Sequence, residues 1–311
     1  MNITVSDGIW PVMITPFTPS GAVDYSGLEA LTNWYIEKGC DGLFAVCTSS
    51  EMTFLDEAER LAIARFVKDC SAGRLPVVAT GFLSDYSENG AEKVKNMYAT
   101  GVDAVVLLTN AFRDGGSDAV FMQNLEHFLK SVPEEIPLGL YECPFPYKRV
   151  LSPDAFRFCA QTGRFYFIKD TCCDPEQIRA KLAAAAGTAL KLFNANSATL
   201  LDSLKNGCAG YCGIMANYHP QLYKWLFHHW ETKPEKAELL QTILTISSFI
   251  EYPNYPMTAK SYLRQFENLP ITDLCRKNNL QPAISSTNQL EIRQLRLLTQ
   301  SLEAWLTDIG A

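Results

Sequence analysis

The sequence predicts an α/β fold, a (β/α)8 TIM barrel followed by a C-terminal helical extension. Short, continuously apolar runs recur along the chain, and amphipathic segments separate them. Runs of this kind are typical of parallel strands that are covered on both faces. A weak repeat at 37–42, 99–104 and 205–210 ends a helix-like stretch at a glycine and begins an apolar run within three residues. The length of 311 residues fits a barrel of about 250 residues plus an extension; an open doubly wound sheet is the alternative.

Eight strands are expected, each an apolar run between two amphipathic segments. In chain order they are Trp10–Thr15, Leu43–Val46, Val77–Thr80, Ala104–Leu108, Leu138–Glu142, Phe165–Lys169, Leu190–Phe193 and Gly210–Ile214. Helices are expected between them, at about 25–38, 56–70, 88–100, 116–131, 152–161, 174–186 and 197–206. Asp24 is expected to cap the first helix, and Ser152 the fifth, where Pro153 follows at the first helical position.

After residue 219 only helical patterns remain, up to Leu290–Thr307, with the turn-rich segment Asn278–Asn288 between them. No long flexible linker precedes these patterns. We therefore expect a barrel over residues 1–219 and a helical extension over 220–311 that packs on it.

The composition excludes several classes of protein. With 47% hydrophobic and 20% charged residues, the chain is neither disordered nor a fibrous repeat. Its 27 basic and 34 acidic residues give a net charge of -7, and no Lys/Arg cluster is present, which argues against a nucleic-acid partner or an anionic membrane surface. The chain has no apolar run of the roughly 20 residues that cross a membrane, and its first residues do not resemble a signal peptide, so we expect a cytoplasmic protein.

Neither a metal nor an organic cofactor is expected. The ten cysteines mostly lie among buried-type residues and are expected to act as small hydrophobes. The spacings Cys172-Cys173 and Cys208-x3-Cys212 are poor for zinc. The four histidines lie away from the predicted strand ends, which disfavours a metal-dependent hydrolase or class II aldolase.

One lysine closes an apolar, aromatic strand. In Phe165–Thr171, period-two alternation puts Phe165, Phe167 and Lys169 on one face. Catalytic groups of a barrel lie at the C-terminal ends of its strands. A desolvated ammonium there would have a lowered pKa, and the neutral amine could attack a carbonyl to form a Schiff base. The alternative is a structural lysine paired with Asp170 or another carboxylate.

Two further groups lie at neighbouring strand ends. Tyr141 ends the preceding strand, where its phenol could move protons beside an amine; the alternative is a packed tyrosine. Thr48 and Ser49 follow the second strand, and their hydroxyl and N–H groups could hold a carboxylate; the alternative is an N-cap and turn cluster.

Together these motifs resemble the dihydrodipicolinate synthase/N-acetylneuraminate lyase family of pyruvate-dependent class I aldolases, over roughly residues 7–300. The matching motifs are Ile14–Phe17, Thr48–Glu51, Tyr141-x-x-Pro144, Ile168–Thr171 and Gly207-x-x-Gly210…Asn217. The resemblance implies a homo-oligomer, a tetramer or dimer. It also assigns roles at the site: Lys169 forms the Schiff base, Tyr141 relays protons, Thr48 and Ser49 hold the pyruvyl carboxylate, and Gly210 and Cys212 place backbone near the pyruvyl unit.

Departures from the family pattern concern the substrate. Both glycines of the hydroxyl loop are replaced in Cys47–Glu51, and Glu142 stands where the family usually has Asn. The synthase branch has an arginine where this chain has Pro146, and its paired tyrosines are missing from 108–113.

The run Lys169-Asp170-Thr171 looks more like the sugar-acid aldolases, in which case Thr171 could contact a substrate hydroxyl. We therefore expect a lyase that cleaves or forms a C–C bond between pyruvate and an aldehyde, on a 2-keto-3-deoxy sugar acid or related 2-oxo acid. A dihydrodipicolinate synthase, a dehydratase of the family and a non-catalytic 2-oxo acid binding protein remain alternatives. Arg113 or Arg149 could replace the missing arginine.

Overall fold

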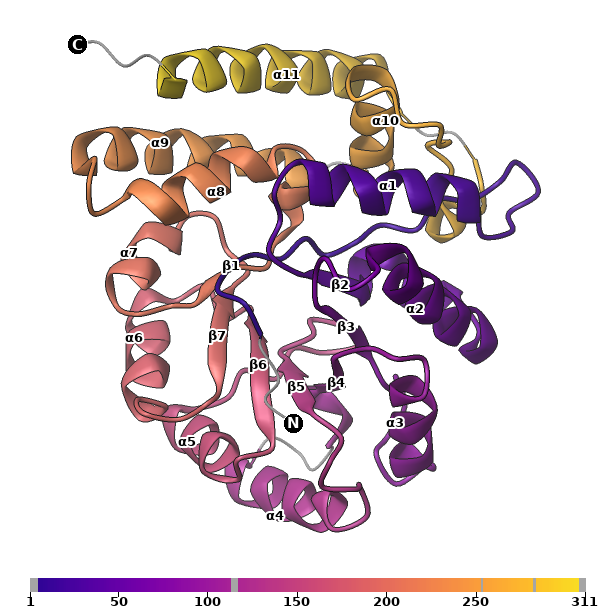
Figure 1. Cartoon of the computed structure of the whole chain (residues 1–311), viewed down its shortest axis with the longest axis vertical. Helices are drawn as coiled ribbons and strands as arrows, with labels where there is room; N and C mark the ends of the chain where they lie inside the picture. The colour runs from indigo at the N-terminus through magenta and orange to yellow at the C-terminus, as the bar shows by residue number, and fades with distance from the viewer. Residues whose placement is uncertain (1–4, 113–116, 253, 282–283, 308–311) are drawn as a thin grey trace.

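The computed structural model describes residues 5–112, 117–252, 254–281 and 284–307. Parallel strands form the centre of the molecule and helices surround them, as Figure 1 shows. The strands are β1 Gly8–Ile9, β2 Leu43–Val46, β3 Val77–Thr80, β4 Ala104–Leu108, β5 Leu138–Tyr141, β6 Phe165–Asp170, β7 Lys191–Asn194 and β8 Gly210–Tyr211. Their order in the eight-stranded sheet is β1-β8-β7-β6-β5-β4-β3-β2. The predicted (β/α)8 barrel is confirmed.

The barrel closes through the segment that follows β1. On one side Gly8 pairs with Gly210 of β8. A Cβ on Gly210, whose φ is +153°, would lie 1.8 Å from the Gly8 carbonyl oxygen, so only glycine permits this approach. On the other side Val12 forms a single parallel bridge with Phe44 of β2.

The first and last strands are shorter than predicted. The segment Trp10–Thr15 is buried but contains Pro11, which has no N–H to donate to a ladder, so β1 ends at Ile9. The predicted strand Gly210–Ile214 ends at Tyr211, because a 3₁₀ turn, η4 (Ile214–Asn217), follows almost at once. The other six strands agree with the predicted ranges to within one residue at each end.

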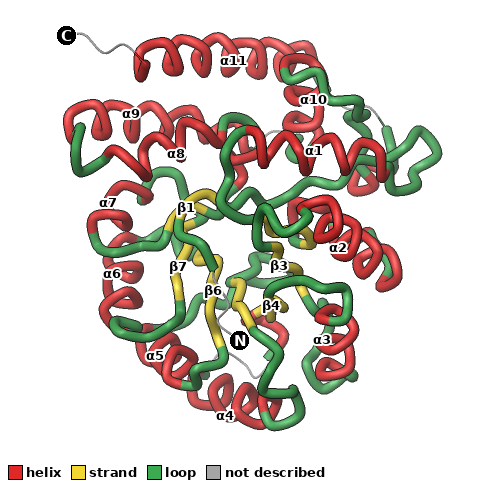
Figure 2. The backbone as a smooth tube through the Cα atoms, viewed as in Figure 1, coloured by secondary structure: helices red, strands yellow, loops and turns green. Residues whose placement is uncertain are grey.

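Seven helices lie between the strands on the outside of the barrel (Figure 2), each close to its predicted range. They are α1 Tyr25–Glu37, α2 Glu57–Ser71, α3 Gly90–Tyr98, α4 Asp118–Leu129, α5 Pro153–Gln161, α6 Pro175–Ala184 and α7 Leu200–Lys205. Both predicted N-caps are present: Asp24 accepts from the Gly27 N–H at 3.0 Å, and Ser152 from the Ala155 N–H at 3.2 Å.

The C-terminal part is helical, as predicted. It consists of α8 Pro220–His229, α9 Pro234–Ser247, α10 Met257–Phe266 and α11 Ser286–Thr307. The short turns η1 Thr48–Ser50, η2 Met52–Phe54, η3 Thr109–Ala111, η5 Ser248–Glu251 and η6 Arg276–Asn278 complete the described elements. Helix α8 packs against both β1 and α11, so the extension lies against the barrel wall.

Aromatic rings fill the barrel interior. The ring of Phe167 lies 5.3 Å from that of Trp10 and 4.9 Å from that of Phe193, and the ring of Phe44 lies 5.7 Å from that of Tyr141. A barrel of this size is a packed core rather than a pore. The rings therefore form an apolar floor beneath the side chains at the C-terminal ends of the strands.

Candidate active site

Lys169 and Tyr141 face each other at the C-terminal mouth of the barrel. They occupy paired positions on the neighbouring strands β6 and β5. The Lys169 Nζ lies 3.5 Å from the Tyr141 hydroxyl and 4.5 Å from the centre of its ring. The two residues are 6% and 2% exposed. Period-two alternation places Phe167 below Lys169 in the barrel core, as the sequence pattern indicated.

The protonation state of Lys169 differs from the sequence-based expectation. Burial lowers the pKa of its ammonium, but Tyr141, followed by two cysteine thiols, raises it more, so the net pKa lies above its usual value. The expectation of a lowered pKa is wrong because acidic groups, and not only apolar rings, surround the amine. Burial in turn raises the pKa of Tyr141 to about 12. At neutral pH the resting pair is therefore an ammonium and a neutral phenol.

Thr48 extends this pair toward the solvent. It belongs to η1, directly after β2, and is exposed. Its Oγ1 lies 3.1 Å from the Tyr141 hydroxyl and 3.5 Å from the Cys143 Sγ. The turn is held by Ser50, whose Oγ accepts from the Cys47 N–H at 2.8 Å. Lys169, Tyr141 and Thr48 thus form a continuous polar path from the buried amine to the mouth of the barrel.

Ser49 points in a different direction from Thr48. It is buried, and it lies close enough to Tyr255 to lower the pKa of that phenol, although burial raises this pKa more. The next acidic residue, Glu51, has a φ of 60° and pairs with Lys260 at 2.9 Å. Glu51 therefore ties the hydroxyl loop to α10.

A buried ion cluster joins the ends of β5 and β6. The Lys181 Nζ, on α6, lies 2.5 Å from Glu142 and 2.6 Å from Asp170, and all three side chains are fully buried. Burial opposes the charge of Lys181, but Glu142 and Asp170 overcome it and raise the pKa of the ammonium. Asp170 is thereby engaged by Lys181, and none of the described carboxylates forms an ion pair with Lys169.

The remaining predicted residues lie around this centre. The Thr171 hydroxyl donates to the Glu142 carbonyl at 2.6 Å, so its proton is used within the protein while its oxygen can still accept. Cys212, one residue past β8, lies close enough to Lys169 for their charges to interact. Gly210 is one pleat lower and serves the closure of the barrel against Gly8.

The structure also adds residues that the sequence motifs did not single out. Cys143 contacts Thr48, and Lys181 neutralises Glu142 and Asp170. The pattern Ile178-x-x-Lys181 on an otherwise buried helix face is the one sequence signal that could have indicated the lysine. Glu251, from η5, lies within electrostatic range of Lys169 although 82 residue positions separate them in the sequence. No local motif could have indicated that contact.

Arg149, one of the two arginines proposed as a replacement, is engaged by α4. The Arg149 guanidinium pairs with Asp118 at 3.0 Å and stacks on the Phe121 ring at 4.8 Å, both on α4. Arg113 lies outside the described residues.

Most of the chain matches the model of one protein family. The model of the dihydrodipicolinate synthetase family matches residues 5–295. The chain belongs to this family. It is therefore a class I aldolase or lyase, an enzyme class in which a lysine forms a Schiff base with the substrate.

Relatives of this dihydrodipicolinate synthetase family member include two named 4-hydroxy-tetrahydrodipicolinate synthase. The one from Porphyromonas gingivalis is 25% identical over 75% of this chain and 78% of its own. The one from Methylococcus capsulatus is 29% identical over 68% of this chain and 70% of its own. Among solved structures, the prophage protein YagE of Escherichia coli K12, in complex with pyruvate, is 25% identical, with a TM-score of 0.80 over 96% of this chain and 99% of that one.

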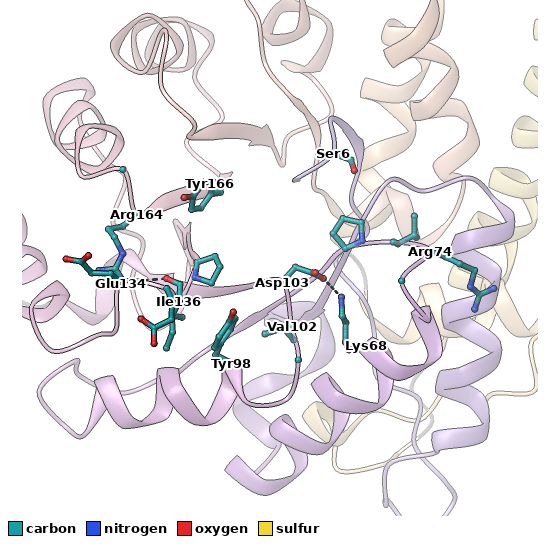
Figure 3. Close-up of a pocket in the computed structure, with 17 residues that line it drawn as sticks. Ser6, Lys68, Arg74, Tyr98, Val102, Asp103, Glu134, Ile136, Arg164 and Tyr166 are labelled. Atoms are coloured by element: carbon teal, nitrogen blue, oxygen red, sulfur yellow. Dashed lines mark hydrogen bonds and ion pairs between the residues drawn. The ribbon is translucent and has the colours of Figure 1, made fainter. Parts of the chain in front are cut away.

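A hollow of about 920 Å³ lies at the other end of the barrel. It is lined by residues that precede β3, β4 and β5 and by the start of β6, among them Lys68, Tyr98, Asp103 and Tyr166 (Figure 3). The Lys68–Asp103 ion pair, at 2.6 Å, crosses it. Residues at the N-terminal end of barrel strands serve stability rather than catalysis. The chemistry is therefore expected at the C-terminal end of the barrel, beside Lys169.

The described part of the chain lacks a membrane-spanning helix and a cluster of metal ligands. None of its helices is long and apolar enough to cross a membrane. Within the same residues, no group of three or more His, Cys, Asp or Glu side chains could hold a metal ion. All ten cysteines are free thiols.

Proposed function

We propose that the enzyme cleaves or forms a C–C bond between pyruvate and an aldehyde through an imine on Lys169. The observation that carries this proposal is the buried Lys169 Nζ, which lies 3.5 Å from the Tyr141 hydroxyl and pairs with none of the described carboxylates. A structural lysine in the same place would be expected to neutralise Asp170, and Lys181 already does so.

In the cleavage direction the amine first loses a proton along the path formed by Tyr141 and Thr48. Its nitrogen attacks C2 of the 2-oxo acid, the C–N bond forms and water leaves. The C4 hydroxyl then gives up its proton while the C3–C4 bond breaks, so that the aldehyde departs and the electron pair moves into the protonated imine. The resulting enamine takes a proton at C3, and water releases pyruvate from the lysine. The phenol is the group placed to move these protons.

We propose a 2-keto-3-deoxy sugar acid, or a related 2-oxo acid, as the substrate. The site offers a hydroxyl-binding group, the acceptor oxygen of Thr171, two residues after the lysine. It lacks the arginine of the synthase branch, since Pro146 occupies that place in an exposed loop and Arg149 is engaged by Asp118. The names of the relatives at 25% and 29% identity favour the alternative, a dihydrodipicolinate synthase.

Borohydride trapping tests the imine. Incubation with pyruvate and borohydride should add one reduced pyruvyl group to the wild-type chain, measured by intact mass. Lys169→Arg should give no adduct, because a guanidinium does not deprotonate at working pH. Lys68→Arg, at the opposite end of the barrel, is the matched control and should trap normally. An adduct that persists in Lys169→Arg would place the nucleophile elsewhere.

A substrate panel separates the two activities. Losing one charge-assisted contact costs about 1.5–3 kcal/mol, which corresponds to about a tenfold to hundredfold loss of specificity. We therefore expect aspartate semialdehyde to be a poor partner of pyruvate and a keto-deoxy sugar acid to be cleaved better. Higher kcat/KM for dihydrodipicolinate formation than for every sugar acid tested would reverse this assignment in favour of the synthase.

We also propose that the enzyme is a homo-oligomer, a dimer or tetramer. The family resemblance implies it, and exposed apolar side chains lie at the end of α9 (Ile246), in η5 (Phe249) and directly after η5 (Tyr252). Light scattering coupled to gel filtration measures the mass, and a monomer at micromolar concentration would contradict the proposal.

A further inference from the structure

Glu251 brings a carboxyl group from the C-terminal extension to the mouth of the barrel. It is the last residue of η5, which follows α9 and packs against η4, the turn directly after β8. Its charge acts on Cys173, in the loop after β6, and on Tyr211, at the end of β8. The charge of Lys169 acts on Glu251 in turn. The carboxyl group is therefore within electrostatic range of the Lys169 amine, on the side of the barrel formed by β6, β7 and β8.

One oxygen of this carboxyl group has no partner. The Glu251 Oε1 is buried and accepts no hydrogen bond from the described residues. Burial raises the pKa of Glu251 to about 7, and the nearby Lys169 limits the rise. An acceptor left buried and unpaired costs free energy, so such a group in a native protein calls for an explanation.

Three tyrosine hydroxyls near Glu251 form hydrogen bonds with other groups. The Tyr223 hydroxyl lies 2.7 Å from Ser197 Oγ, and the Tyr211 hydroxyl lies 3.1 Å from the same atom. The Tyr218 hydroxyl lies 2.9 Å from Thr258 Oγ1. All three tyrosines lie within electrostatic range of Glu251, yet none donates to its Oε1. The Oε1 atom is therefore available to accept a hydrogen bond from a bound molecule.

We propose that Glu251 receives a hydroxyl group of the substrate, on the part of the molecule that leaves as the aldehyde. This inference rests on the proposed function, because it requires a substrate held as an imine on Lys169. A hydroxyl suits the site better than an ammonium group. It can donate to a carboxylate and accept from a carboxylic acid, and a carboxyl group with a pKa near neutrality is present in both forms. Glu251 thus selects polyhydroxylated 2-oxo acids over unsubstituted ones of the same length.

The test is a competition for Lys169 between two acids that differ only in hydroxyl groups. Wild-type enzyme is mixed with equal amounts of 2-oxohexanoate and a 2-keto-3-deoxyhexonate (the gluconate form and its C4 epimer in separate samples) and reduced with borohydride. Intact mass gives the ratio of adducts, and any pyruvate adduct counts as sugar acid that was captured and cleaved. Because the readout is a ratio within one sample, a general loss of reactivity does not change it.

We expect the wild type to favour the sugar acid. Glu251→Ala should lower the ratio by about tenfold to a hundredfold, the range of one hydrogen bond to a charged group. Glu251→Asp, which withdraws the carboxyl group by one methylene, should lower it by a smaller factor and serves as the second variant if Ala impairs folding. A ratio that neither variant changes overturns the inference, since the group would then hold water only. A wild type that traps pyruvate but shows no preference also overturns it and leaves the proposed function standing, whereas a wild type that traps no 2-oxo acid overturns both.

Discussion

At the scale of single residues, the Tyr141 hydroxyl connects the amine to the mouth of the barrel. It lies 3.5 Å from Lys169 Nζ and 3.1 Å from Thr48 Oγ1. Burial raises the pKa of this phenol to about 12, so it holds its proton at neutral pH and can pass it on only within a chain of neighbours. The ring also packs against Phe44, so removing the hydroxyl leaves the packing intact.

Tyr141→Phe should therefore separate trapping from turnover. We expect pyruvate trapping to survive, because Lys169 remains, and turnover of the sugar acid to fall by about 10²–10⁴-fold, as for the loss of a general acid–base group. Tyr166→Phe, on the same sheet but at the opposite end of the barrel, is the matched control. Wild-type turnover in Tyr141→Phe would reduce Tyr141 to a packing role.

The positions of some site residues can be predicted from the sequence, whereas their electrostatic surroundings cannot. Lys169, Tyr141 and Thr48 could be singled out because each lies at a predicted strand end, and parallel strands bring such ends together. The direction of the Lys169 pKa shift could not be predicted, because it depends on Tyr141, Cys47 and Cys212, which come from three other strands. Glu251 cannot be identified from the sequence, because no pattern in or around η5 indicates that this turn packs near the barrel mouth.

At the scale of elements, the Lys181 cluster holds two strands and a helix together. Its three side chains are fully buried, and they fix the ends of the strands that carry Tyr141 and Lys169. Glu142 additionally accepts from the Leu151 N–H at 2.9 Å and the Thr171 N–H at 3.0 Å, so both of its oxygens are used. Glu142 therefore positions the neighbouring residues of the site and is not expected to contact the substrate.

Lys181→Met should be strongly destabilising. It leaves two buried carboxyl groups without their cation, and breaking a buried ion pair in this way costs about 3–5 kcal/mol. Lys68→Met is the matched control, since its pair with Asp103 is partly exposed and such pairs contribute about 0–1 kcal/mol. Urea unfolding at pH 7.5 measures both. Equal losses in the two variants would mean that the cluster contributes no more than a surface pair.

Strand bounds are predicted most accurately where an apolar run in the sequence coincides with a strand that is buried on both faces. The four strands β2 to β5 are buried on both faces and read as unbroken apolar runs, and their ranges were predicted to within one residue. The strands β1 and β8 were predicted too long. The apolar runs there continue as buried backbone that closes the barrel and turns into η4, and burial alone does not distinguish a strand from such a segment.

At the scale of the whole molecule, one histidine lies where the barrel ends and the extension begins. His219 precedes α8 and is buried, and its Nδ1 lies 2.9 Å from Thr299 Oγ1 on α11. Its Nε2 is buried without a hydrogen-bond partner among the described residues. Burial lowers the pKa of His219 to about 3, because a proton on this ring would bring a charge into an apolar contact between α8 and α11.

The molecule should therefore lose stability in mild acid through this histidine. The pKa is about 3 in the folded protein and about 6.5 in the unfolded chain, so between these values the unfolded state binds the extra proton and stability falls as pH falls. The loss is about 1.4 kcal/mol per pH unit, or about 2 kcal/mol between pH 8 and pH 5.

His219→Gln cannot take up the proton. Its stability should therefore fall by about 2 kcal/mol less over the same range, whatever the cost of the substitution itself. Urea unfolding of both proteins at the two pH values measures this difference, and hydrogen exchange should locate the acid-induced loosening in Ser286–Thr307. Parallel losses in the two proteins would show that other groups control the acid response.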